Sequence, residues 1–100
     1  MDFDEWDARR ERRERMWATY GKPDIVDAVA ALQVLGITEV TPTQVIAMRY
    51  RDQEAADAYA AANLEQGLSM LGTYDVPGGV VGVLDLRPEI ARLDAERGKG

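Results

Sequence analysis

The feature that most constrains the fold is a run near the start of the chain that contains no apolar side chain. Residues 9–15 read RRERRER, with five arginines and two glutamates. Acidic and basic residues recur here at the i, i+4 spacing of helical ion pairs. These pairs are Glu5–Arg9, Arg10–Glu14 and Glu11–Arg15. The run therefore predicts a helix with a charged middle of about 10 Å, which a small domain cannot bury in its interior.

Aromatic residues lie on both sides of this charged run. Together with two of the arginines they follow the 3-4 spacing of a heptad seam. The seam consists of Phe3, Trp6, Arg10, Arg13, Trp17 and Tyr20. We expect a helix that Asp2 caps, with Glu5 at capping-box spacing, and that ends at Gly21.

The seam has two interpretations. Trp, Tyr and Arg are enriched at binding hot spots, so all six seam residues are candidates for binding a protein partner or a second copy that offers carboxylates to Arg10 and Arg13. In the alternative, Trp17 and Tyr20 join the core of the domain and the arginines are simply solvated. In either case the helix cannot lie wholly in one core.

Two further helices are expected in the middle of the chain. Pro23 suits a first helical position, and the apolar residues after it predict a helix that Gly36 ends in a left-handed conformation, with Ile37 as the apolar partner of a Schellman motif. The sequence Thr41-Pro42-Thr43-Gln44 has the composition of a capping box. It predicts a third helix that ends between Asn63 and Gly67.

The last third of the chain has a different composition. Residues 68–76 and 80–86 read as a β-hairpin around Pro77-Gly78-Gly79, and the glycines equally permit an extended arm. A short helix is expected from Pro88 to Arg97. The predicted fold is mostly α in one domain, 1–100, with an N-terminal helix (1–21) that projects, a helical core (22–66) and an extended segment or hairpin plus short helix (67–100).

The composition argues against an enzyme. The chain has no His and no Cys, so it has no thiolate, no disulfide and no histidine base for Ser69 or the threonines. The acid–base candidate is Asp52 with Glu54 or Asp57, if burial raises the pKa of Asp52. We expect no cofactor, no metal and no small-molecule substrate. No apolar segment is long enough for a signal peptide or a membrane span, which predicts a cytoplasmic protein.

These observations predict a non-catalytic assembly or protein-interaction subunit that works through its N-terminal helix and its C-terminal extended segment. The richness in Ala, Arg, Gly and Val resembles that of small proteins of phages or mobile elements, which implies a virion connector or similar structural protein, within a virion. One alternative is a DNA-binding regulator with a helix-turn-helix outline. Its contacts would come from Thr43, Gln44, Arg49 and Arg51. A second alternative is an acidic inhibitor that mimics nucleic acid, because the net charge is −6.

Overall fold

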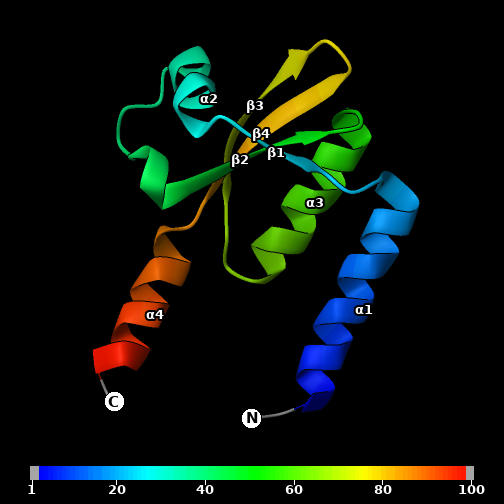
Figure 1. The fold of residues 1–100 in the computed structure, drawn as a ribbon, viewed down its shortest axis with the longest axis vertical. Helices are drawn as coiled ribbons and strands as arrows, with labels where there is room; N and C mark the ends of the chain where they lie inside the picture. Colours follow the sequence, from blue (N-terminus) through cyan, green and yellow to red (C-terminus); the bar gives the residue numbers. More distant parts are fainter. Residues whose placement is uncertain (1–2, 99–100) are drawn as a thin grey trace.

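The computed structural model describes the backbone of residues 3–98 and the side chains of residues 7–98. The described chain forms a four-stranded antiparallel sheet with helices on both faces and at one end (Figure 1). In chain order the elements are α1 (Phe3–Tyr20), β1 (Asp24–Val26), α2 (Ala28–Leu35), the 3-10 helix η1 (Pro42–Gln44), β2 (Val45–Tyr50), α3 (Gln53–Glu65), β3 (Met70–Val76), β4 (Gly79–Asp85) and α4 (Arg87–Gly98).

The strand order in the sheet is β1-β2-β4-β3. Strands β2 and β4 lie in the centre and are paired from Val45 opposite Asp85 to Tyr50 opposite Val80. Strand β4 is buried along almost its whole length. This explains its nearly continuous apolar sequence, since a strand covered on both faces does not alternate between polar and apolar residues.

The two faces of the sheet carry separate hydrophobic clusters. On one face α2 packs on alternate residues of the central strands, with Leu32 against Ala47 and Val83. On the other face α3 supplies Ala55, Ala56 and Tyr59 around Tyr50. The last two turns of α1 join this second cluster through Met16, Trp17 and Tyr20.

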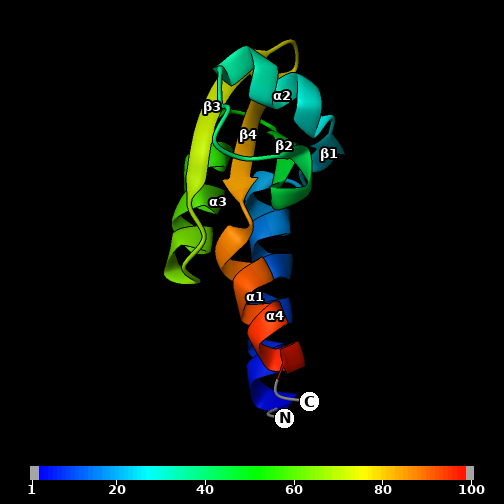
Figure 2. The ribbon, with the colours of Figure 1, turned by 90° about the vertical axis from the view of Figure 1, so that its left-hand side faces the viewer.

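Helices α1 and α4 both extend past the same end of the sheet (Figures 1 and 2). Residues 7–15 of α1 are all exposed, and none of the residues of α4 is buried. Tertiary packing therefore stabilises only the C-terminal part of α1 and hardly stabilises α4.

The prediction of a mostly α fold with a helical core over residues 22–66 is wrong. Residues 24–26 pair with β2 as a strand, and α2 begins only after Asp27, whose side chain accepts a hydrogen bond of 2.9 Å from the Val29 amide. Asp27 falls inside the predicted helix that begins near Pro23. In the structure it is the N-cap of the shorter helix α2.

The predicted third helix is also interrupted. Gln44 Oε1 accepts a hydrogen bond of 3.0 Å from the Thr41 amide, as expected of a capping box, but the helix that starts there is only the 3-10 turn η1. Residues 45–50 follow as β2, and a new helix, α3, starts after Asp52, which accepts a hydrogen bond of 2.8 Å from the Ala55 amide. Pairing with β4 over the whole of β2 outweighs the local helical signal.

Four other predictions are confirmed. Helix α1 ends before Gly21, which has a φ of 84°. Gly36 has a φ of 66°, and the Ile37 amide donates to the Leu32 carbonyl, which is the Schellman pattern. The hairpin forms from β3 and β4, and α4 covers the predicted last helix. The predicted cap formed by Asp2 and Glu5 lies outside the described side chains.

Candidate binding cleft

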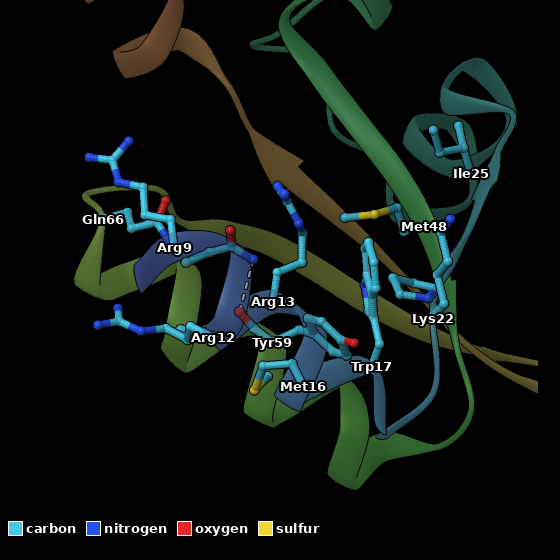
Figure 3. A pocket seen from close by; sticks show the side chains of 13 residues that line it. Arg9, Arg12, Arg13, Met16, Trp17, Lys22, Ile25, Met48, Tyr59 and Gln66 are labelled. Atoms are coloured by element: carbon cyan, nitrogen blue, oxygen red, sulfur yellow. Dashed lines mark hydrogen bonds between the residues drawn. The ribbon is translucent and has the colours of Figure 1, made fainter. Parts of the chain in front are cut away.

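A cleft of about 470 Å³ lies between α1, α3 and the edge of the sheet formed by β1 and β2 (Figure 3). Its apolar lining comes from four elements of the chain. These residues are Met16 and Trp17 of α1, Ile25 of β1, Met48 of β2, and Tyr59 and Ala62 of α3. Ile25 and Met48 are opposite each other in the β1–β2 register and so lie on the same face of the sheet. Ile25 is 74% exposed, which is unusual for a residue beside a hydrophobic cluster.

The lining also contains four cationic residues: Arg9, Arg12, Arg13 and Lys22. The spacing of 9, 12, 13, 16 and 17 is that of one face of a helix, so α1 presents arginines and apolar side chains to the same cleft. Among the residues that the structure describes, no carboxylate lines the cleft. The cleft is therefore positive over an apolar floor, although the chain as a whole is acidic.

Trp17 contacts cationic residues of the lining and is itself part of the apolar floor. The Arg13 guanidinium carbon lies 5.6 Å from the centroid of the Trp17 ring, and Lys22 Nζ lies 4.9 Å from it. Both distances allow cation–π attraction. These contacts hold two of the cationic groups beside the apolar floor, as Figure 3 shows.

The ion pair of Arg12 is weak. Arg12 Nη1 lies 3.6 Å from Glu65 Oε2 on α3, and both side chains are more than half exposed. An ion pair of this kind contributes little to stability. The Arg12 guanidinium can thus turn to another carboxylate at little cost.

The structure distributes the six predicted partner-binding residues unevenly. Arg13 and Trp17 line the cleft, whereas Tyr20 packs edge-on against Tyr59 with ring centroids 6.4 Å apart. Arg10 lies outside the cleft lining and forms an exposed ion pair of 3.4 Å with Asp7. The side chains of Phe3 and Trp6 lie outside the described residues, although both positions belong to α1.

The sequence analysis missed several lining residues. Arg9, Arg12 and Met16 could have been found from their helical spacing with Arg13 and Trp17, because the heptad seam is only one of the faces that the run allows. Ile25 and Met48 could not have been found, since both were assigned to helices.

The expected helix-turn-helix is wrong, because β2 follows α2 where the recognition helix was predicted. Thr43 and Gln44 belong to η1, and both lie next to Thr41, with which Thr43 shares a hydroxyl–hydroxyl hydrogen bond of 2.9 Å. Arg49 donates to Asp24 at 2.8 Å across the β1–β2 pair. Arg51 donates to Asp52 at 3.0 Å and to the Thr19 carbonyl at 3.2 Å. The two guanidinium groups are thus engaged within the chain.

Asp52, the N-cap of α3, does not have the raised pKa that was expected of the acid–base candidate. The amide of Ala55 and the guanidinium of Arg51 donate to Asp52, and these hydrogen bonds lower the pKa of its carboxyl group. Asp57 accepts a hydrogen bond of 2.8 Å from Gln53. Among the described side chains, those of residues 7–98, no group of three or more acidic residues is arranged to hold a metal ion. None of the described helices is long and apolar enough to cross a membrane.

Comparisons with protein families, curated proteins and solved structures find no match to this chain. The cleft is therefore the main evidence for function. An apolar floor beside positive groups favours a ligand that combines apolar and anionic groups, such as an acidic protein segment with aromatic or aliphatic side chains.

Proposed function

We propose that this chain is a non-catalytic protein-interaction or assembly subunit, and that the cleft between α1 and α3 binds an acidic segment of a protein partner. The observation that supports this most directly is the lining of the cleft. Four cationic residues surround an apolar floor, and no carboxylate lies among the described lining residues. Aromatic and arginine residues carry much of the binding energy in protein interfaces once a partner covers them.

A protein segment fits the cleft better than a nucleic acid does. The net charge of −6 repels a polyanion that must run across the surface. A short acidic segment meets only the local positive charge, and its apolar side chains can contact Met16, Ile25 and Met48. Removing the exposed Ile25 side chain from water is favourable in proportion to the area covered.

The projecting helices support an assembly role. Helix α4 has no buried residue, and its two large apolar side chains, Ile90 and Leu93, are 36% and 44% exposed. A helix of this kind gains packing only when a neighbour covers it. Since α1 and α4 extend past the same end of the sheet (Figure 2), one neighbouring protein can contact both. A virion connector or a similar structural subunit is the specific form that we propose.

The C-terminal hairpin has a smaller part in this proposal than the sequence analysis gave it. Strand β4 pairs with β2 on one side and β3 on the other, so its backbone groups are satisfied within the chain. Of the two hairpin strands, β3 lies at an edge of the sheet, and β1 forms the opposite edge. The proposal therefore depends on α1 and its cleft.

A peptide-display selection against the immobilised protein tests the proposal. Selected peptides should be acidic, should contain aromatic or aliphatic residues, and should bind the double variant Arg12→Glu/Arg13→Glu at least about tenfold more weakly. The matched control is Arg10→Glu/Arg15→Glu, which changes the net charge of α1 equally but alters two residues outside the cleft lining. Equal losses in both variants, or a selection without acidic peptides, would contradict the proposal.

A further inference from the structure

We propose that the segment that occupies the cleft is the N-terminal segment of a second copy of this chain, so that two copies exchange these segments. This inference rests on the proposed function of the cleft and adds the identity of the partner. The observation behind it is the complementarity between residues 1–7 and the cleft that residues 9–17 help to form.

The N-terminal segment has the composition that the cleft requires. Residues 1–7 read MDFDEWD, with four carboxylates, no Lys or Arg, and the two large aromatic residues Phe3 and Trp6. The cleft has four cationic residues and an apolar floor. The charges are equal in number and opposite in sign, and each side also offers apolar surface.

The segment cannot reach the cleft of its own chain. Helix α1 is continuous from Phe3 to Tyr20. At 1.5 Å per residue, Phe3 lies about 21 Å along the helix axis from Trp17. Because one wall of the cleft is the same helix, its first turns would have to fold back on it. A second copy has no such restriction.

An antiparallel pair of α1 helices satisfies both copies at once. If the two-fold axis passes near Arg10, residue positions that sum to 20 lie opposite each other. The two Arg10 side chains meet at the axis, and each has its own Asp7 as an opposite charge. Phe3 then lies beside the second copy's Trp17, and Asp7 lies between its own Arg10, at 3.4 Å, and the second copy's Arg13. Each contact occurs twice, as in any interface with two-fold symmetry.

Two charge-reversal variants of the full chain test this arrangement by sedimentation velocity. The variant Asp4→Arg/Asp7→Arg reverses two of the four acidic residues of the segment and leaves the cleft unchanged. The variant Arg12→Glu/Arg13→Glu reverses two of the four cationic residues of the cleft and leaves the segment unchanged. We expect the natural chain to be a dimer, each variant alone to be a monomer, and the one-to-one mixture of the two variants to form a heterodimer. In the mixture one contact is the natural one, and in the other the new arginines of one variant meet the new glutamates of the other. Circular dichroism establishes that each variant is folded.

The control Asp94→Arg/Glu96→Arg makes the same charge change on α4 and should leave the dimer intact. Dimers of either cleft or segment variant alone, or a mixture that stays monomeric, would overturn the inference. A natural chain that is monomeric but still binds the selected acidic peptides would overturn the exchange and keep the proposed function. Failure of peptide binding as well would overturn both.

Discussion

The hydroxyl group of Tyr59 on α3 donates a hydrogen bond of 2.8 Å to the backbone carbonyl oxygen of Gly21, directly after α1. This bond joins two parts of the chain that are 38 residues apart. It fixes the C-terminal end of α1 against α3, and α1 and α3 are two walls of the cleft. The position of the arginines over the apolar floor therefore depends partly on this contact.

Replacement of Tyr59 by Phe should lower the free energy of unfolding by about 1 kcal/mol, since it removes a partly buried hydrogen bond and leaves the carbonyl of Gly21 without that donor. Urea denaturation measures the change. Tyr74→Phe is the control, because among the described residues its hydroxyl group has no hydrogen bond within the chain. An equal loss in the two variants would show that the bond to Gly21 contributes nothing specific.

Tyr50 should behave in the opposite way. Its side chain is 2% exposed, and within the described part of the chain its hydroxyl group has no hydrogen-bond partner. Tyr50→Phe should leave the free energy of unfolding unchanged or raise it by up to about 1 kcal/mol at neutral pH, since it removes a buried polar group without a partner. A clear loss of stability would indicate an unrecognised partner for the hydroxyl group.

The same residue predicts a dependence on alkaline pH. Burial, and to a smaller extent the charge of Tyr59, raises the pKa of Tyr50 to about 12, from 10.0 in the unfolded chain. The unfolded state therefore loses its proton first, and the stability that is present below pH 10 is lost as the pH rises toward 12. Urea titrations across this range should show a steeper loss in the natural chain than in Tyr50→Phe. Equal slopes would contradict the assignment.

Asp85 and Arg87 make a second testable pair, at the junction of β4 and α4. Asp85 is 7% exposed. Its carboxylate accepts hydrogen bonds from the Arg87 guanidinium at 3.0 and 2.9 Å and from the Arg87 amide at 2.9 Å. Asp85→Asn should lower the free energy of unfolding by about 1 kcal/mol at neutral pH, because it removes the charge from this pair.

The pH dependence of this variant provides the check. The bonds from Arg87 lower the pKa of the Asp85 carboxyl below 3.8 in the folded state. Their contribution is therefore present above the unfolded pKa and is lost as the pH falls through the folded value. The difference between the natural chain and Asp85→Asn should shrink in acid. A difference that stays constant down to low pH would exclude this explanation.

Gly79, at the start of β4, should not tolerate a side chain. A Cβ atom there would lie 2.1 Å from the backbone carbonyl oxygen of Tyr50 on the neighbouring strand. Gly79→Ala should therefore cost about 2 kcal/mol or more, because the central β2–β4 pair must shift. Gly98→Ala is the control, since nothing lies within 4 Å of its added Cβ. Equal melting temperatures of the two variants would contradict the close approach.

Local signals in the sequence were sufficient where an element is fixed by its own residues. Gly36 must adopt a left-handed conformation to end α2, and Pro77-Gly78-Gly79 must turn, so both could be read directly. The strands β1 and β2 could not, because their pairing joins Ile25 to Met48, which are far apart in the chain. An apolar stretch of this length is compatible with a helix or a strand until its partner is known.

The candidate site likewise has a part that the sequence predicts and a part that depends on long-range pairing. Arg13 and Trp17 were identified because they lie on one helix at a regular spacing. The sheet side of the cleft, with Ile25 and Met48, depends on the β1–β2 pair, and its identification therefore required the structure. Asp52 falls inside the predicted third helix, whereas in the structure it caps α3. A single capping residue is a weaker signal than helical spacing over a whole segment, so the sequence predicted one continuous helix through Asp52.

The most direct test of the account is the mass of the full chain in solution, measured by light scattering at several protein concentrations and at low and high salt. Exchange of the acidic segments predicts about twice the chain mass of 11.1 kDa at low salt and a shift toward 11.1 kDa as salt screens the charges. A mass of 11.1 kDa at every concentration and salt would contradict the exchange of segments between two copies.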